Sequence, residues 1–392
     1  MAWKINLFDK KICRDLAYSV RVQFLGRPRY IKFIYNQTLK NEAIKVAPQI
    51  TYSQKGIIVQ SNGKSISLDP MTYGYCDLTF VSHAHTDHMY KKSLHKNCKT
   101  TTLVSKTTSI LAKARGYDLS EVTEDYDGLE LIDTGHILGS KGLLVGHELF
   151  YTGDISIRER AFMKPACIPS ANTLIIESTF GRPEYIFPSL TEILDKTNRI
   201  ISQMYDLGIP VVLMGYSLGK AQLLAALFDH WEPVFVHDSI YNMNTTYSKL
   251  GIHIKDMVPY STAEKAGLIK RNEPWLMIAP LSSSRNSFVK QVKQKYKAVT
   301  IGFSGWAVNS RYKYMMGLDY AMPISDHCDY NELIRVVTKC NPKMVYTVHG
   351  FADDLAMALT RIGFEAEPLN KKTGKKPIQK VTSNSSLDLY FK

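Results

Sequence analysis

Long apolar runs are missing from this sequence, and its cysteines show no pairing pattern. No stretch of about 18 consecutive apolar residues occurs, which excludes an ordinary transmembrane helix. The first residues lack the apolar segment of a secretory signal. The six cysteines are scattered without a C-x-x-C pair, so neither a disulfide framework nor a cysteine zinc site is indicated. We therefore expect a soluble, intracellular protein of a reducing compartment, with no membrane partner.

Acidic residues are scarce relative to basic ones. The chain has 49 Lys and Arg against 36 Asp and Glu, a formal net charge of +13. Such an excess favours a polyanionic partner through electrostatic steering and counterion release. With 392 residues, of which 45% are hydrophobic, the chain is long enough for two domains with sizeable cores.

Three histidines and an aspartate follow the apolar run at 78–81 within six residues. In an extended chain, alternate residues project to the same side, so His83 and His85 can bind one ion together. As the chain turns, Asp87 and His88 would face a second position about 4 Å away, the separation of a two-metal hydrolase site. This loop predicts a metal centre built from imidazole and carboxylate.

Similar side chains recur where later predicted strands end. We expect His136 to complete the ligands of the ion held by His83 and His85, and Asp154 to bridge the two ions. The series of such side chains is His136, Asp154, Glu177, His327 and His349.

Two features leave alternatives open. Asp69, at an earlier strand end, could orient a ligand histidine from behind or only shape the turn before proline. The segment Gly215–Gly219 matches the G-x-S-x-G nucleophile elbow, and His230, His237 and His253 follow it. A plainer role for that segment is a helix N-terminus whose amides contact a phosphate.

The order of these motifs resembles the metallo-β-lactamase superfamily, and specifically its β-CASP nucleases, over about residues 48–370. The segments that most resemble the exonucleases associated with bacterial DNA ligases are ESTFGRPEYIFP (177–188), LGKAQ (218–222), FVH (235–237), SGW (304–306) and SDH (325–327). By this resemblance the four lactamase motifs fall at Asp69, at His83 to His88, at His136 and at Asp154. The three β-CASP motifs fall at Glu177, His327 and His349.

The resemblance implies an α/β fold, an αββα sandwich with an inserted β-CASP α/β domain. The implied division is a basic N-terminal extension (1–47), the metallo-β-lactamase domain (48–184 and 300–370), the β-CASP domain (185–299) and a flexible basic tail (371–392). One ion would be held by His83, His85, His136 and Asp154, and the other by Asp87, His88, Asp154 and His349. Imidazole and carboxylate without thiolate suit two zinc ions, with manganese or iron as alternatives.

The implied chemistry is the attack of activated water on phosphorus. We expect His327, supported by Glu177, to protonate the departing oxygen, because imidazole titrates near neutral pH. Asp87 is the third predicted catalytic residue. Side chains and backbone expected to hold the phosphate are Ser325, Ser304 and Gly305.

The resemblance implies a 5′-to-3′ DNA exonuclease of repair or replication, with endonuclease cutting as an additional activity, acting in the cytoplasm on the nucleoid. Its substrate would be single-stranded DNA or DNA with single-stranded ends. An RNA-processing nuclease is the alternative, because His349 resembles RNA-processing members, whereas DNA-acting members such as Artemis usually carry valine there. The ligase-associated group also has histidine at this motif, so the residue is compatible with either substrate. A small-molecule metallohydrolase would share the His83 loop but would not need Glu177 or His327.

Both ends of the chain carry separate indications. The N-terminal extension interleaves basic and aromatic residues, which fits either a surface that contacts a phosphate backbone or a solvated edge strand. The tail resembles a sliding-clamp-binding motif, in which Leu387, Tyr390 and Phe391 would fill one pocket of the clamp.

Overall fold

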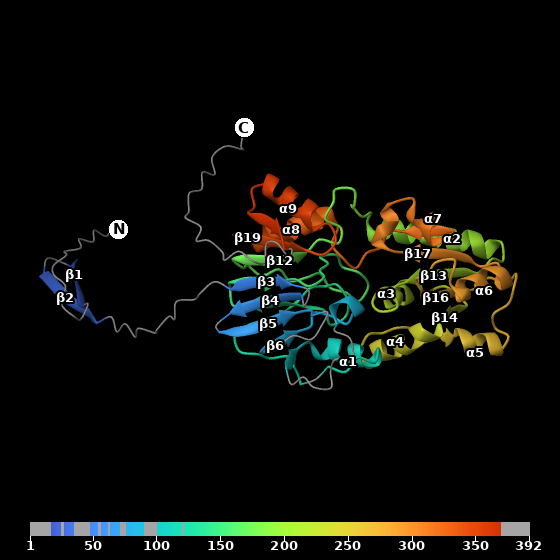
Figure 1. Cartoon of the computed structure of the whole chain (residues 1–392), viewed down its shortest axis with the longest axis horizontal. Coiled ribbons are helices and arrows are strands. Elements are labelled where there is room, and N and C mark those ends of the chain that lie inside the picture. The colour runs from blue at the N-terminus through green and yellow to red at the C-terminus, as the bar shows by residue number, and fades with distance from the viewer. Residues whose placement is uncertain are drawn as a thin grey trace. The chain divides into compact units, whose positions relative to one another are not determined.

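The computed structural model describes residues 17–24, 27–34, 48–53, 56–61, 63–70, 76–89, 100–119 and 121–369. The chain separates into two compact units, residues 1–46 and 47–392. In the first unit, β1 (Ala17–Phe24) and β2 (Arg27–Ile34) form an antiparallel hairpin. All other elements belong to the second unit (Figure 1). Within the described ranges, no helix is both long and apolar enough to cross a membrane.

Two six-stranded sheets of the second unit pack face to face. The first sheet has the order β3-β4-β5-β6-β7-β8 and the second β20-β19-β12-β11-β10-β9. Their shared core includes Phe80 from one sheet and Tyr151 from the other, whose rings meet edge to face with centroids 6.1 Å apart. The strands are β3 (Gln49–Ser53), β4 (Gly56–Ser61), β5 (Lys64–Leu68), β6 (Leu78–Phe80), β7 (Thr101–Leu103), β8 (Val122–Thr123), β9 (Leu129–Asp133), β10 (Lys141–Val145), β11 (Leu149–Tyr151), β12 (Thr173–Glu177), β19 (Met344–Val348) and β20 (Ala366–Pro368).

Helices α8 (Tyr330–Cys340) and α9 (Ala352–Arg361) cover the other face of the second sheet. Helix α8 begins directly after the loop that carries His327. Asp329 caps it, since its carboxylate accepts from the Glu332 N–H and the Glu332 carboxylate accepts from the Asp329 N–H, both at 2.9 Å. Arg158 pairs with both carboxylates. The loop that carries His327 is thereby fixed at its C-terminal end.

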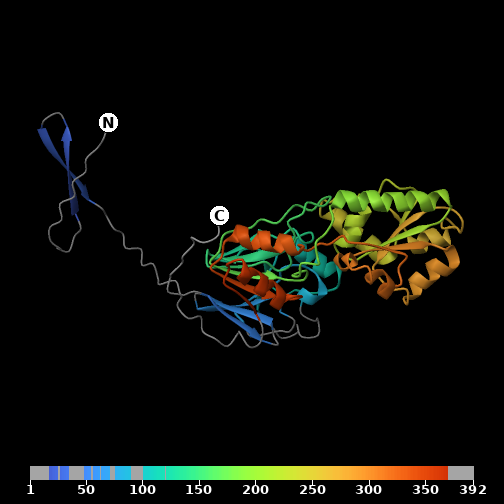
Figure 2. The ribbon, with the colours of Figure 1, turned by 90° about the horizontal axis from the view of Figure 1, so that it is seen from above.

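A third sheet, of order β15-β14-β16-β13-β17-β18, is parallel throughout. Its central strands are continuous apolar runs because helices cover both faces (Figure 2). The strands are β13 (Val211–Gly215), β14 (Val234–Val236), β15 (Val258–Pro259), β16 (Leu276–Pro280), β17 (Val299–Phe303) and β18 (Tyr320–Met322). The helices are α2 (Leu190–Asp206), α3 (Lys220–Leu227) and α4 (Asp238–Lys249) on one face, with α5 (Tyr260–Lys265), α6 (Ser287–Tyr296) and α7 (Tyr312–Met316) on the other.

The mixed α/β class predicted from the sequence is confirmed, but the strand pairing differs from the predicted division of the chain at residue 300. Strand β17 pairs with β13, and β18 pairs with β17, so both strands belong to the third sheet instead of returning to the first two. The reason is that β17 is apolar and buried next to β13, as a strand inside a parallel sheet must be. The chain returns to the second sheet only through α8 and β19.

One apolar core joins the first sheet and the third. Val81 and Ile137, beside the histidine loop, belong to the same buried cluster as Leu218 and Leu224 around α3. Helix α1 (Lys106–Ala114) contributes to this cluster as well. The start of α3 is therefore packed directly against the loops that follow β6 and β9.

Candidate metal centre

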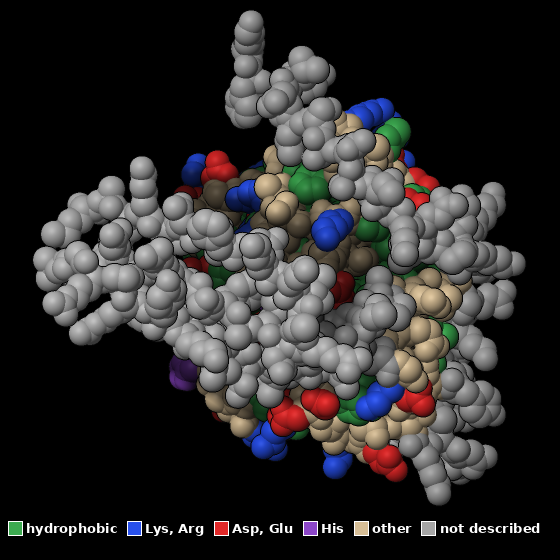
Figure 3. Space-filling model, turned by 90° about the vertical axis from the view of Figure 1, so that its left-hand side faces the viewer, with side chains coloured by type: hydrophobic (Ala, Val, Ile, Leu, Met, Phe, Trp, Pro, Cys, Tyr) green, Lys and Arg blue, Asp and Glu red, His purple; other side chains and the backbone are tan. Residues whose placement is uncertain are grey.

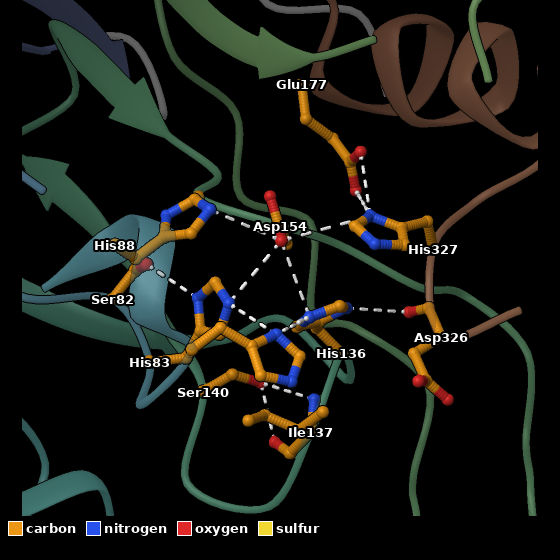
Figure 4. A network of polar contacts seen from close by, with 12 residues as sticks. Ser82, His83, His88, His136, Ile137, Ser140, Asp154, Glu177, Asp326 and His327 are labelled. Atoms are coloured by element: carbon orange, nitrogen blue, oxygen red, sulfur yellow. Dashed lines mark hydrogen bonds and ion pairs between the residues drawn. The ribbon is translucent and has the colours of Figure 1, made fainter. Parts of the chain in front are cut away.

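Four of the predicted ligands converge on one point. Figure 4 labels three of them, His83, His136 and Asp154. One ligand atom from each of His83, His85, His136 and Asp154 lies within 4.8 Å of the other three. His83 Nε2 and His136 Nε2 are each 3.4 Å from Asp154 Oδ2, and each is 3.1 Å from His85 Nδ1. Tetrahedral zinc with bonds near 2.0–2.1 Å would place its ligands about 3.4 Å apart. The spacing of the four atoms thus fits a single small cation.

The hydrogen bonds of the three imidazoles also fix where their lone pairs point. Each ring donates through the nitrogen that faces away from the cluster, so the inner nitrogen of the neutral ring carries a lone pair. The pairs are His83 Nδ1 with Ser82 Oγ (2.9 Å), His85 Nε2 with the Leu218 carbonyl (3.1 Å) and His136 Nδ1 with the Asp326 carbonyl (2.9 Å). Ser82 is free to accept because its own hydroxyl donates to Asp69.

Burial keeps these rings neutral. It lowers the pKa values of His83 and His136 well below the ordinary value, and that of His85 to about 4. Three lone pairs and a carboxylate that face one buried point repel one another unless a cation lies between them. The donor set therefore fits a metal ion.

The residues predicted for a second ion lie beside this cluster but are less tightly gathered. His88 Nε2 is 3.4 Å from Asp154 Oδ2 and 3.9 Å from Asp87 Oδ2. The His349 ring lies 5.6 Å from the His88 ring, centroid to centroid. Asp87 is exposed. These four ligand atoms do not form a cluster as compact as that around His85.

Asp69 lies behind His88 and accepts four hydrogen bonds. Its Oδ1 accepts from the Ser82 N–H (2.7 Å), and its Oδ2 accepts from Ser82 Oγ (2.6 Å), His88 Nδ1 and Tyr151 Oη (both 2.8 Å). His88 Nε2 is thereby directed at Asp154. Burial alone would lower the pKa of His88, but the charges of Asp154 and Asp69 outweigh it and raise that pKa to about 10. The surrounding carboxylates favour a positive charge at this position.

Glu177 and His327 form a charged pair on the other side of Asp154. His327 Nδ1 is 2.9 Å from both carboxylate oxygens of Glu177, and Glu177 also accepts from the Ile155 N–H at 2.8 Å. Burial lowers the pKa of His327, but Glu177 and Asp154 more than offset it and raise that pKa to about 9. Asp154, Glu177 and His327 also bring ligand atoms together. The short contacts of Nδ1 with Glu177 describe an ion pair rather than two metal ligands.

One cleft of about 760 Å³, between the sandwich and the third sheet, is bordered by His85, Asp87, His88 and Asp154. His327 and His349 face it, as do the predicted phosphate-holding residues. Ser325 Oγ accepts from the His327 N–H at 3.0 Å, which leaves the serine hydroxyl proton free to donate. Ser304 is buried in the wall, and a Cβ at Gly305 would lie 2.4 Å from the Phe180 ring. The wall at this point admits only glycine.

Comparison with known proteins supports one family. The family described as "Zn-dependent metallo-hydrolase RNA specificity domain" matches residues 320–367. The chain is 34% identical to a "Probable DNA ligase" of Opitutus terrae over 74% of its own length and 28% of that protein. It is 25% identical to an "RNase J-like protein" of Methanocaldococcus jannaschii over 70% of this chain and 81% of the relative. A "DNA cross-link repair 1A protein" of Gallus gallus is 24% identical over 76% of this chain and 33% of the relative.

The chain belongs to the β-CASP family of the metallo-β-lactamase superfamily. It spans little more than a quarter of the DNA ligase relative. A crystal structure of a protein of unknown function from Enterococcus faecalis V583 shares the fold, with a TM-score of 0.55 and 13% identity over 83% of this chain and 99% of that one.

The G-x-S-x-G segment of this β-CASP protein is not a nucleophile elbow. Among the described residues, no hydrogen bond joins Ser217 to His230, His237 or His253, and His237 bonds to Ser239 instead (2.9 Å). Nor is the helix start an open anion site, because the Gly219 N–H already donates to the Gln222 side chain at 2.8 Å.

Sequence reasoning missed the groups that orient the ligands. The Leu218 carbonyl receives His85, and a backbone carbonyl has no signature in a sequence. Arg115, which holds the Ala84 carbonyl and Thr86 of the histidine loop, lies on a separate helix end. Tyr151 could have been found only from the register of β11 against its neighbours, which brings its hydroxyl to Asp69.

Replacing Asp69 by asparagine tests this β-CASP metal centre. Asp69→Asn keeps the size of the side chain but turns one accepting oxygen into a donor facing Ser82, His88 or Tyr151. We expect zinc affinity to fall about 10- to 100-fold, because His88 loses its fixed orientation. Competition with a chromophoric chelator measures the affinity.

Asp77→Asn is the matched control. Asp77 is an exposed acid that accepts from Ser65, away from the cleft, so zinc affinity should stay at the wild-type value. Equal affinity of Asp69→Asn and the wild type would contradict the role given to Asp69.

Proposed function

We propose that this chain is a metal-dependent nuclease that hydrolyses phosphodiester bonds, with DNA as its substrate. One observation carries the proposal. The ligand cluster around His85, which fits a metal ion, and the charged His327 ring lie at the same cleft. Relatives named for DNA repair and for RNase J-like activity support nucleic acid as the substrate class. A small-molecule hydrolase would have no need of the His327–Glu177 pair.

We assign the first ion to His83, His85, His136 and Asp154, and a second to His88, Asp87, Asp154 and His349, with zinc in both positions and manganese or iron as alternatives. When bound, such ions lower the pKa of water to about 7 and neutralise charge on the phosphate oxygens. The ligand side chains of His83, His136 and Asp154 are buried, and electrostatic effects are stronger in a buried site than in water.

His327 is the proposed general acid. His327 Nδ1 donates its proton in a hydrogen bond to Glu177. The proton that can be transferred to the leaving oxygen is therefore the one on His327 Nε2. The pKa of about 9 keeps the ring protonated at neutral pH until the leaving group takes the proton. Asp87, on the exposed edge of the histidine loop, would contribute its carboxylate to the second ion. The Ser325 and Ser304 hydroxyls and the close wall at Gly305 would receive the phosphate.

The charge of the chain supports binding to a phosphate backbone. Residues 1–47 carry ten Lys and Arg against three acids, and residues 370–392 carry six against one, so these ends account for twelve of the thirteen net positive charges. On the face in Figure 3, acidic and basic side chains of the described residues are interspersed instead of forming one patch. We infer that the basic ends supply much of the electrostatic attraction for the nucleic acid.

For the substrate, we propose single-stranded DNA or single-stranded ends of duplex DNA, cut from the 5′ end, with endonuclease cutting as a second activity. Two relatives are named for DNA ligation and DNA cross-link repair, which supports a place in repair or replication. RNA is the second candidate, favoured by the RNase J-like relative and by the name of the matching domain.

The tail gives a candidate partner. The motif at Leu387, Tyr390 and Phe391 lies outside the described residues, and its resemblance to sliding-clamp ligands supports a clamp as partner. We expect a peptide of residues 380–392 to bind a sliding clamp, and binding to vanish when these three residues are alanine. Calorimetry measures it, and an intact peptide that does not bind removes this partner.

A cleavage assay on matched 5′-labelled single-stranded DNA and RNA tests the function. We expect the DNA to be degraded, the reaction to stop with chelator, and RNA to be cut more slowly. His327→Ala should lower kcat about 10²- to 10⁴-fold, because the leaving oxygen then departs without a proton. Gel analysis over time measures both.

His237→Ala is the control, since His237 lies in the third-sheet region and bonds only locally to Ser239. It should cleave like the wild type. Degradation of RNA alone would overturn DNA as the substrate. Cleavage of neither strand by metal-loaded protein would overturn the nuclease itself.

A further inference from the structure

A lysine is buried where the third sheet meets the metal cluster. Lys220 is the first residue of α3, and its side chain is only 2% exposed. Its Nζ lies 3.0 Å from Asp326 Oδ2 and donates to the Ile324 carbonyl at 2.9 Å. Lysines are almost never buried unless paired, because an ammonium loses its hydration there. The mechanism proposed above gives this lysine no role.

A second buried cation holds the same region from the other side. Arg160 lies 3.6 Å from Asp326 Oδ1 and donates to the Ser325 carbonyl at 2.9 Å. Its other amino group donates to the carbonyls of Gly135 and His136. Two buried cations thus share one buried carboxylate. All the carbonyls they hold belong to the loops that carry His136 and His327.

These contacts end at two proposed metal ligands. The Asp326 carbonyl accepts from His136 Nδ1, as Figure 4 shows, and so fixes the direction of that ring. Two residues before Lys220, the Leu218 carbonyl accepts from His85 Nε2. A Cβ at Gly219 would lie 2.4 Å from the side chain of Ile137. The backbone at the start of α3 therefore packs directly against Ile137, the residue after His136. The start of α3 therefore touches the surroundings of both imidazoles.

We propose that Lys220 is a positioning residue, which holds the Asp326 loop and the start of α3 in the register that aims His136 and His85 at the metal. The inference rests on the proposed metal centre but not on the identity of the substrate. The Lys220–Asp326 ion pair is then the contact through which the third-sheet region fixes the orientation of the metal ligands. Lys220 itself contacts no reacting atom, because both groups within reach of Nζ lie in the wall.

Lys220→Met tests the proposal, since methionine fills a similar volume without charge. We expect zinc affinity, measured with a competing chelator, to fall about 10- to 100-fold. The visible absorption spectrum of the Co²⁺-substituted protein should change as well, because its bands report the ligand geometry. Lys220→Arg should recover part of the affinity, since arginine keeps a charge beside Asp326.

Lys293→Met is the matched control. Lys293 pairs with Asp319 at 2.8 Å in the third-sheet region, away from the cleft. It should leave zinc affinity and the Co²⁺ spectrum unchanged. If Lys220→Met lowers the melting temperature as Lys293→Met does but leaves metal affinity and spectrum unchanged, the proposal is wrong. A raised KM for DNA with unaltered metal affinity would instead make Lys220 a substrate contact.

Asp326→Asn keeps the test decisive if Lys220→Met fails to fold. It removes the charge but retains the backbone carbonyl that receives His136, and we expect weaker zinc binding in the same direction. Wild-type zinc affinity in Asp326→Asn would overturn the proposal. Failure of the wild-type protein to bind zinc at all would overturn the metal centre itself, which separates the two outcomes.

Discussion

The metal centre depends on the repulsion between imidazole lone pairs and a carboxylate that face the same buried point. His83, His85 and His136 all present unprotonated nitrogens to Asp154, because each ring donates its only proton outward. Burial keeps the rings neutral, so the protein does not resolve the repulsion by protonating them. Only a cation stabilises such an arrangement. Positive charge is also favoured next to Asp154 at His88, because the neighbouring carboxylates raise the pKa of that histidine.

The fold satisfies this constraint by collecting loops from separate strands. Ends of the two sandwich sheets supply the ligands, and the third-sheet region supplies orientation through the start of α3. Neither part alone completes the site. Beside the cluster, the Glu177–His327 pair holds a proton near neutral pH. The cleft thus brings a cation site and a proton donor side by side, with the His327 ring 4.5 Å from the His136 ring, centroid to centroid. These are the two groups that the proposed phosphodiester hydrolysis uses.

Much of this arrangement was predictable because it follows local rules. The spacing of His83 and His85 by two residues places them on one side of an extended chain, and the β-strand ends bring distant side chains to one edge. The pairing of β17 with the third sheet could not be predicted, since an apolar strand fits either sheet. The Leu218 carbonyl and the Lys220–Asp326 pair depend on contacts between segments a hundred residues apart, which no local pattern encodes.

Anomalous X-ray scattering at the zinc absorption edge, from crystals grown with zinc, tests the central claim most directly. The account predicts a strong peak among His83 Nε2, His85 Nδ1, His136 Nε2 and Asp154. A second peak is expected on the His88 side of Asp154. Crystals that show no peak in this cluster, or zinc bound only elsewhere on the chain, would contradict the account.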